Sequence, residues 1–166
     1  MTFDKSLDPN NMFKSIYDFS SQMKEAKLIG EHIDLNNTYE GVQNIVLCGM
    51  GGSAIGGDLS RSLISNSLEV PLVVNRNYGL PNWVNSNSIV IASSYSGNTE
   101  ETLNTYHEAV SKGAKVIGIT TGGKLGSLLD KNNNDKVLIP AGLQPRAAVA
   151  FSFVPLLFLL KKLNAT

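Results

Sequence analysis

The sequence predicts an α/β protein of three layers (αβα), in which helices cover both faces of a doubly wound, five-stranded parallel sheet. Five short apolar runs alternate with segments of helical periodicity, and this alternation is typical of parallel βαβ units. Glycine- or hydroxyl-rich turns follow the first and third runs. With 166 residues, of which 42% are hydrophobic and 17% charged, the chain suits one globular domain with its own core.

The elements follow one another simply along the chain. An N-terminal helix is expected over 8–30, because an Asp-Pro pair favours a helix start and apolar residues then recur at helical spacing. The parallel sheet core is expected over 44–140, and a C-terminal helix over 145–164. The whole chain, 1–166, is interpreted as a single domain.

The core is expected to hold five strands and three helices. The strands are placed at 44–49, 71–75, 88–93, 115–120 and 136–140, and the helices at 53–64, 99–113 and 124–130. The link over 75–87 has room for barely one helical turn, so a full crossover helix is not expected there. Apolar residues share one face in two helices: Ile55, Leu59 and Leu63 in the first, and Leu103, Tyr106 and Val110, expected to point inward, in the second.

Composition excludes several classes of protein. Fourteen basic and fourteen acidic residues give a net charge of zero, so no nucleic-acid partner is expected. The N-terminal segment MTFDKSLDPN is polar and acidic, unlike a signal peptide. The single cysteine, Cys48, excludes an intramolecular disulfide and fits a reducing compartment, so we expect a cytoplasmic protein.

The longest apolar run, AAVAFSFVPLLFLL over 147–160, is apolar almost all round. It contains Ser152 and Pro155 and falls short of the roughly 18 residues of a membrane span, so no membrane partner is expected. A helix on the outside of a sheet needs only one apolar stripe. We therefore interpret this run as an interface helix and expect a homodimer.

Polar loops follow two of the predicted strands. The first strand ends in GMGGSAIGG (49–57) and the third in SSYSGNTEE (93–101). Ligands of an open parallel sheet bind beyond the carboxyl ends of its strands, and the helix N-termini that follow offer free N–H groups suited to phosphate. Because Ser94, Ser96 and Thr99 add hydroxyl donors, the second loop is interpreted as a phosphate cradle.

Two other interpretations of these loops stay open. Clusters of serine, glycine and asparagine also form ordinary turns, in which Thr99 would only cap a helix. Gly49, Gly51 and Ala54 satisfy the G-x-G-x-x-A pattern of dinucleotide-binding proteins. That pattern expects an acidic residue after the second strand, where this chain has an asparagine and an arginine.

The segment SYSGNTEET (94–102) resembles the S-x-S-G-x-T-x-E-T hallmark of the SIS (sugar isomerase) domain, a phosphosugar-binding domain of flavodoxin-like fold. VLCGMGGSAIGGD, RNYGLP, SIVIASSYSGNTEET and AGLQPRAAVAF are similar, in the same order, to the N-terminal half of the bifunctional phosphoglucose/phosphomannose isomerases. The resemblance implies reversible conversion of glucose 6-phosphate or mannose 6-phosphate into fructose 6-phosphate through an enediol. It implies a phosphorylated hexose as substrate, no metal and no cofactor.

The resemblance also implies residue roles. They are phosphate binding for Ser94, Ser96 and Thr99, contact with the sugar for Gly51, Gly52 and Ser53, and stabilisation of the developing oxyanion by the cation Arg146. The residues themselves also single out Arg146. Pro145 marks a first helical turn, where the helix dipole disfavours a cation, so an arginine there suggests an anionic partner. A solvated surface arginine is the alternative.

A catalytic base and a ring-opening histidine are not evident in this chain. The family has both in a second SIS domain, which is expected to be absent here. His107 lies about 12 Å along a helix from Thr99, too far for direct contact with a sugar, and is expected to be a surface or partly packed histidine. His32 lies in a polar connection and is expected to be solvated. Glu100 and Glu101 stabilise a first helical turn, and Glu101 matches the hallmark rather than the family's base. We therefore expect the chain alone to be inactive, and a non-catalytic sugar-phosphate-binding module is the alternative.

Overall fold

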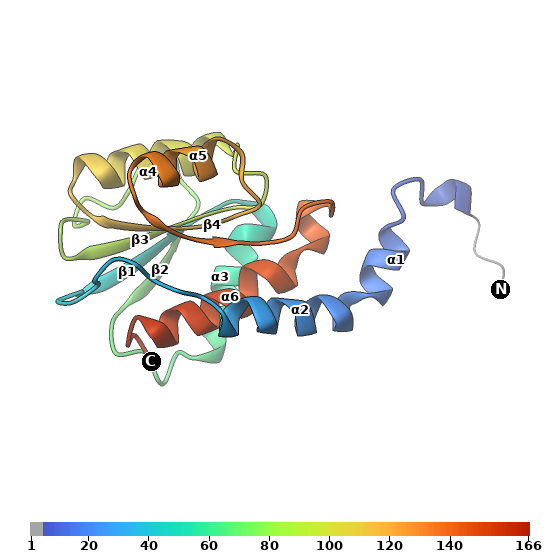
Figure 1. The fold of residues 1–166 in the computed structure, drawn as a ribbon, viewed down its shortest axis with the longest axis horizontal. Helices are drawn as coiled ribbons and strands as arrows, with labels where there is room; N and C mark the ends of the chain where they lie inside the picture. The colour runs from blue at the N-terminus through green and yellow to red at the C-terminus, as the bar shows by residue number, and fades with distance from the viewer. Residues whose placement is uncertain (1–4) are drawn as a thin grey trace.

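The computed structural model describes residues 5–166, and its centre is a sheet of five parallel strands (Figure 1). Their order, β2-β1-β3-β4-β5, is that of flavodoxin-like folds. The strands are β1 (Asn44–Cys48), β2 (Leu72–Asn75), β3 (Ser88–Ser94), β4 (Lys115–Thr120) and β5 (Asp135–Leu138). The α-helices are α1 (Met12–Tyr17), α2 (Phe19–Glu31), α3 (Gly51–Leu63), α4 (Glu100–Ser111), α5 (Gly123–Lys131) and α6 (Val149–Lys162), and the short 3₁₀ helices are η1 (Lys5–Leu7) and η2 (Pro145–Ala147).

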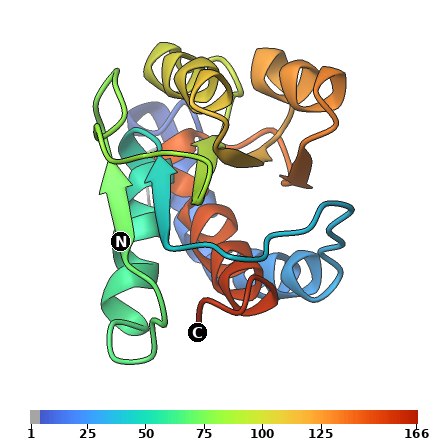
Figure 2. The ribbon, with the colours of Figure 1, turned by 90° about the vertical axis from the view of Figure 1, so that its left-hand side faces the viewer.

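Helices cover both faces of the sheet. Side chains of β1 alternate between the two cores, with Ile45 and Leu47 in one and Val46 and Cys48 in the other. Helices α4 and α5 pack on the second face, and α6 packs on the first together with α2 and α3 (Figure 2). The predicted three-layer, doubly wound, five-stranded parallel sheet is confirmed.

The five strands lie where they were predicted, with ends shifted by at most two residues. The link between β2 and β3 contains no helix, as expected. It is held down instead by the buried side chains of Leu80 and Val84. The backbone N–H of Leu80 also donates to the Glu108 carboxylate of α4 at 2.8 Å.

The N-terminal helical segment is broken, so the prediction of one helix over 8–30 is wrong. Helices α1 and α2 meet at Asp18, whose backbone (φ −80°, ψ 3°) leaves helical geometry. The first helix begins at Met12, because the Asp8 carboxylate accepts hydrogen bonds from the N–H groups of Met12 at 2.7 Å and Phe13 at 2.8 Å. No residue of α1 is fully buried, and α1 extends away from the body of the molecule (Figure 1).

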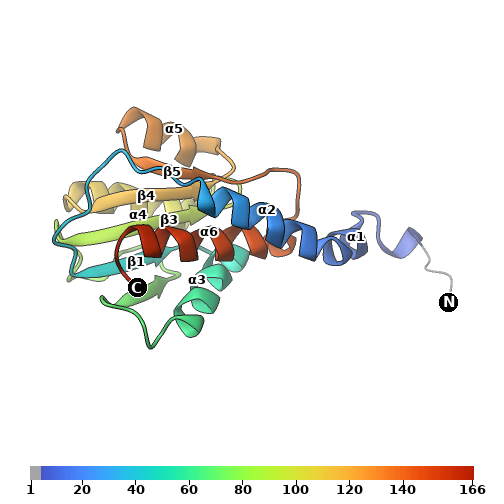
Figure 3. The same cartoon turned by 60° about the horizontal axis from the view of Figure 1, so that its bottom comes forward.

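The C-terminal helix begins later than predicted. Pro145–Ala147 form the 3₁₀ turn η2, and α6 begins only at Val149 because Ala148 (φ −102°, ψ 20°) departs from helical geometry. Helix α6 lies between α2 and α3 (Figure 3). No helix within residues 5–166 has the length and apolar character that crossing a membrane requires.

Glycines allow α6 to approach both of its neighbours closely. A Cβ atom on Gly30 of α2 would lie 2.4 Å from the Phe158 ring, and one on Gly56 of α3 would lie 2.5 Å from the Ser152 hydroxyl. Most of the apolar surface of α6 is therefore covered by its own chain. Burial of α6 therefore does not require a partner subunit, contrary to the reason given for a dimer in the sequence analysis.

The apolar face of α3 points outward. Ile55, Leu59 and Leu63 are 46%, 44% and 66% exposed. The inward face of α3 consists instead of small residues, among them Gly56 and Ser60, which fit against the sheet and α6. An apolar stripe is left on the surface.

The face of α4 that packs on the core differs slightly from the prediction. Tyr106 is fully buried as predicted, and Leu103 is half-buried against the core. The prediction for Val110 is wrong, because Ala109 takes the inward position and Val110 is 42% exposed.

A buried carboxylate fastens the connection before β1 to the start of β5. Asp135 accepts hydrogen bonds from the N–H groups of Asn36 at 2.9 Å and Asn37 at 3.0 Å and from the Tyr39 hydroxyl at 2.7 Å. Burial would raise the pKa of Asp135, but the hydrogen bonds from Tyr39, Asn36 and Asn37 outweigh it and hold that pKa below its ordinary value. Burial and the adjacent carboxylate raise the pKa of Tyr39.

Candidate functional site

The hydroxyl loop, residues 94–99, runs from the end of β3 to the start of α4. The hydroxyl oxygens of Ser94 and Thr99 lie 2.8 Å apart and share one hydrogen bond. Thr99 precedes α4 but makes no side-chain cap hydrogen bond. The alternative in which Thr99 only caps a helix is therefore not supported, because its hydroxyl is directed at Ser94 instead.

Ser96 lies exposed at the tip of the hydroxyl loop. Its hydroxyl oxygen accepts a hydrogen bond from the N–H of Asn98 at 3.2 Å. Gly97 allows the tight turn because its φ of +68° lies in the left-handed region, which favours glycine. A serine hydroxyl has one hydrogen to donate, and no acceptor in residues 5–166 takes that of Ser96.

The glycine loop, residues 49–53, lies directly beside the hydroxyl loop. Strands β1 and β3 are neighbours, with Cys48 opposite Ala92, so the two loops leave the same edge of the sheet. A Cβ atom on Gly49 would lie 2.8 Å from the Ser93 carbonyl oxygen, which explains the glycine. Gly51 (φ +49°) opens helix α3, and Ser53 is buried in its first turn.

The segment that carries Arg146 packs on the glycine loop. A Cβ atom on Gly52 would lie 2.5 Å from the Pro145 carbonyl oxygen and 3.6 Å from the Arg146 Cα. The Ser152 hydroxyl shares its one hydrogen between the Gly52 carbonyl at 3.0 Å and the Val149 carbonyl at 3.1 Å, so α6 reaches the same place. The structure thus brings the predicted sugar-facing loop next to the predicted cation.

Arg146 is exposed and has no ion-pair or hydrogen-bond partner within the part of the chain that is described. Because it lies in the 3₁₀ turn η2 and not in the first turn of α6, the helix-dipole argument for it is wrong. The proximity of its backbone to Gly52 is the observation that connects it with the site.

A third loop, residues 120–125, adjoins the hydroxyl loop and was missed by the sequence reasoning. It follows β4, the other neighbour of β3. The N–H of Thr121 donates to the Tyr95 carbonyl at 3.1 Å, and the N–H of Leu125 donates to the Gly97 carbonyl at 2.8 Å. The Thr-Thr-Gly-Gly stretch after the fourth strand was the available signal, since it repeats the hydroxyl and glycine composition of the other loops.

The dinucleotide interpretation finds no support in the residues after β2. The carboxamide of Asn75 donates to the Gly79 carbonyl at 3.0 Å, so it stabilises the turn that follows. Arg76 forms an ion pair with Asp58 of α3. No acidic residue occupies the position that would bind a ribose.

The two histidines and the cysteine make no hydrogen bond to the hydroxyl loop within residues 5–166. His32 and His107 are both exposed, as expected. Burial raises the pKa of the Cys48 thiol to about 11, so it remains protonated and is no nucleophile at neutral pH. Within residues 5–166, no three His, Cys, Asp or Glu side chains lie close enough together to hold a metal ion.

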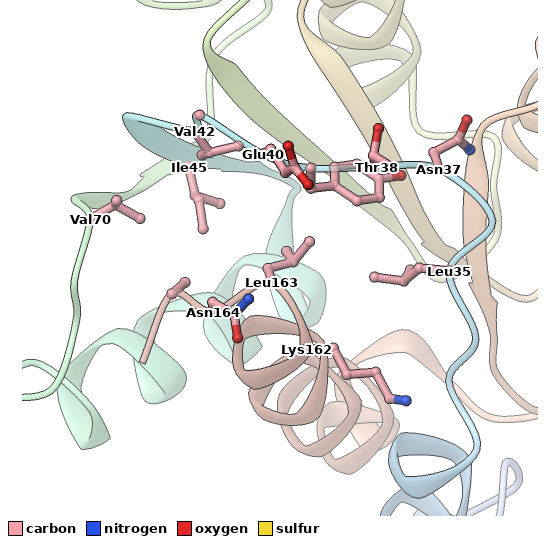
Figure 4. Close-up of a pocket in the computed structure, with 13 residues that line it drawn as sticks. Leu35, Asn37, Thr38, Glu40, Val42, Ile45, Val70, Lys162, Leu163 and Asn164 are labelled. Carbon is pink, nitrogen blue, oxygen red and sulfur yellow. The ribbon is translucent and has the colours of Figure 1, made fainter.

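A separate hollow of about 500 Å³ lies at the opposite edge of the sheet (Figure 4). Thr38, Glu40 and Val70 line it together with Lys162 near the end of α6. Ile45 at the start of β1 also borders it, so it lies at the amino ends of the strands. In an open parallel sheet, ligands bind at the carboxyl ends, and no residue of the three loops reaches this hollow.

Comparison with known proteins identifies the family. Residues 39–163 match the SIS domain. The chain belongs to the SIS domain family. This SIS chain is 51% identical over 153 residues to the bifunctional phosphoglucose/phosphomannose isomerase of Caldicellulosiruptor bescii, covering 92% of the chain and 45% of that relative. It is 46% identical over 114 residues to the protein of the same name from Thermoplasma acidophilum, covering 69% of the chain and 34% of the relative. The resemblance inferred from the motifs is confirmed, and the SIS chain spans less than half the length of these relatives.

A third relative of the SIS chain bears another name. The D-glucosamine-6-phosphate 4-epimerase of Sulfolobus acidocaldarius is 35% identical over 121 residues, covering 72% of the chain and 38% of that protein. Solved structures agree on the fold. The C-terminal domain of glucosamine-fructose-6-phosphate aminotransferase from Francisella tularensis superimposes with a TM-score of 0.71 at 20% identity over 93% of the chain and 49% of that structure. A putative phosphosugar isomerase from Clostridium difficile gives 0.69 at 18% identity over 91% and 46%.

Proposed function

We propose that the SIS chain is the phosphosugar-binding half of an isomerase that interconverts glucose 6-phosphate or mannose 6-phosphate with fructose 6-phosphate. The observation that carries the proposal is the hydroxyl loop, which presents donor groups at the carboxyl edge of the sheet next to the glycine loop. The names of the C. bescii and T. acidophilum relatives support the reaction. The reaction belongs to glycolysis and carbohydrate metabolism.

Ser94, Ser96 and Thr99 bind the substrate's phosphate in this proposal. The pair formed by Ser94 and Thr99 uses one of its two hydroxyl hydrogens internally and leaves the other for a ligand. Ser96 contributes a second free hydroxyl hydrogen. Hydrogen bonds to a charged phosphate are stronger than those between neutral groups, so two such donors favour a phosphorylated over an unphosphorylated sugar.

Gly51, Gly52 and Ser53 face the sugar, and Arg146 acts as the catalytic cation. Proton transfer between C1 and C2 builds negative charge on the enediolate oxygen, and a positioned cation stabilises that charge. The backbone of Arg146 lies beside Gly52, and its side chain is not neutralised by an ion pair in residues 5–166. An unpaired cation at this place can pair with the enediolate oxygen.

The base and the ring-opening histidine come from a second SIS domain in this proposal. Enediol chemistry needs a positioned general base. His32 lies beside the Leu28 carbonyl and the His107 ring packs edge-on against Tyr106, so neither is tied to the hydroxyl loop. Without that second domain, we expect the SIS chain to bind sugar phosphates without turning them over. A non-catalytic binding module is the alternative, and it would show the same binding in every assembly without any activity.

We further propose that the protein is cytoplasmic and forms a homodimer. The single cysteine is buried and unpaired, which suits a reducing compartment. The dimer is supported by the apolar stripe of α3 and by an apolar groove between α2, α3 and α6, which together we call the α3–α6 apolar surface. The groove is lined mainly by Met23, Leu63, Phe153, Leu157 and Phe158.

The test combines binding and turnover. Calorimetry on the SIS chain should detect fructose 6-phosphate and should detect no binding of fructose at the same concentrations. A coupled assay on the same preparation should give turnover below about 1 s⁻¹, the lower end of ordinary enzymes. Equal binding of both sugars would exclude the phosphate site, and faster turnover would mean that the chain contains its own base.

A further inference from the structure

We propose that Asn98 is a positioning residue, which fastens the hydroxyl loop to the first turn of α5 and so holds Ser96 in place for phosphate. The inference rests on the proposed function of the hydroxyl loop. Asn98 itself is exposed and is not among the phosphate-binding residues proposed above. Its role follows from the bonds that it makes.

The carboxamide of Asn98 uses both its acceptor and its donor. Its Oδ1 accepts a hydrogen bond from the N–H of Lys124 in α5 at 3.1 Å. Its Nδ2 donates to the Ser96 carbonyl at 3.1 Å, and its backbone N–H donates to the Ser96 hydroxyl oxygen at 3.2 Å. The Asn98 side chain therefore connects Ser96 with α5, the helix that follows the neighbouring strand β4.

The two segments joined by Asn98 are in direct backbone contact. A Cβ atom on Gly97 would lie 1.8 Å from the Gly122 carbonyl oxygen, and one on Gly123 would lie 2.4 Å from the Ser96 carbonyl oxygen. Both glycines have left-handed backbones, with φ of +68° and +65°. Any side chain at Gly97 or Gly123 would collide with the facing backbone. The two glycines therefore allow the loops to approach closely.

The N-terminal end of α5 gains from the contact as well. The first N–H groups of a helix lack partners within it. Here the N–H of Lys124 is bonded to Asn98, and the N–H of Leu125 to the Gly97 carbonyl at 2.8 Å. Because the Asn98 bonds lie at the surface, their loss should loosen the hydroxyl loop and leave the core intact. A loop that must be ordered on binding costs affinity.

The first variant is Asn98→Ala. It should weaken binding of fructose 6-phosphate and of inorganic phosphate by the same factor, roughly fivefold to tenfold, because both ligands use the loop. The matched control is Asn104→Ala, which removes an exposed asparagine of α4 whose amide donates to the Tyr78 carbonyl at 2.7 Å. This control should bind both ligands as wild type does.

Amide hydrogen exchange reports on the fastening without any ligand. Asn98→Ala should speed the exchange of the Lys124 amide. Asn98→Asp keeps the acceptor oxygen for that amide but loses the donor to the Ser96 carbonyl, so it should restore part of the protection. Unchanged exchange in Asn98→Ala, or unchanged affinity for both ligands, would overturn the positioning role. If the wild-type chain binds neither ligand, the proposed function itself fails, and exchange still decides whether Asn98 fastens the loop.

Discussion

The hydroxyl oxygens of Ser94 and Thr99 lie 2.8 Å apart and close the hydroxyl loop across its base. Ser94 is the last residue of β3, and Thr99 immediately precedes α4. The bond therefore joins the strand to the helix and fixes the width of the turn between them. Donors that are held in place before binding do not have to be ordered by the ligand.

Removing two of the hydroxyl groups should weaken phosphate binding strongly. The double variant Ser96→Ala, Thr99→Ala loses the exposed donor and one member of the bonded pair, so its affinity for fructose 6-phosphate should fall at least about a hundredfold. Calorimetry measures the change. Ser111→Ala, which removes a serine hydroxyl bonded to the Glu108 carbonyl at the far end of α4, is the matched control. Binding as tight as in the wild type would refute the assignment of the loop.

Arg146→Ala should lower kcat at least about tenfold, or about 1.4 kcal/mol in the transition state, when the domain works in an active two-domain protein. The reason is the loss of a cation beside the developing oxyanion. Because Arg146 is exposed and unpaired in residues 5–166, the free energy of unfolding should change by less than about 0.5 kcal/mol. Lys131→Ala, another exposed cation, should leave kcat unaltered. An unchanged kcat with a raised KM would make Arg146 a binding residue.

Light scattering at micromolar concentration should find a homodimer. The double variant Leu59→Lys, Leu63→Lys places two charges on the α3–α6 apolar surface, and it should be monomeric because a buried, unpaired charge is costly. Val110→Lys alters an exposed apolar residue on the other side of the sheet and should remain dimeric. A wild-type chain that is a monodisperse monomer would contradict the dimer.

The free energy of unfolding should fall on acidification through the carboxylate of Asp135. A carboxyl whose pKa is lowered in the folded state stabilises the fold at pH above its unfolded value of about 3.9. That stabilisation is lost as the pH drops from there through the folded pKa. Asp135→Asn should lower the free energy of unfolding at pH 7 by about 1–3 kcal/mol and flatten the acid limb in denaturant titrations. Asp34→Asn, at an exposed carboxylate of the same connection, should change neither.

Two glycine-to-alanine variants should act in opposite directions. Gly56→Ala should destabilise the protein by about 1–2 kcal/mol, since the new Cβ would lie 2.5 Å from the Ser152 hydroxyl and force α3 and α6 apart. Gly126→Ala in α5 meets no atom within 4 Å and should stabilise the helix by about 0.5–1 kcal/mol. Thermal and denaturant unfolding measure both. A stabilising Gly56→Ala would mean that the two helices are not in close contact.

The sequence by itself determined the sheet and the positions of its loops. A strand of a parallel sheet is buried on both faces, so its residues are nearly all apolar and a short apolar run predicts it. The strand at 115–120 was therefore placed without error. The missing crossover helix after β2 was also predictable, since a link of that length cannot hold one. Serine, threonine and glycine favour turns through their local hydrogen bonds and backbone conformations. The hydroxyl and glycine loops could therefore be located from the sequence.

Only the tertiary structure decided which side chains meet. The stripe of Ile55, Leu59 and Leu63 was visible in the sequence, but its outward direction depends on the close approach of α6 at Gly56. The break at Asp18 and the late start of α6 depend on local dihedral angles that helical periodicity does not encode. The bond from Asn98 to Lys124 joins residues of two connections that become neighbours only when β3 and β4 pair. Periodicity reports how a segment meets its surroundings, whereas partners far apart in the chain are chosen by packing.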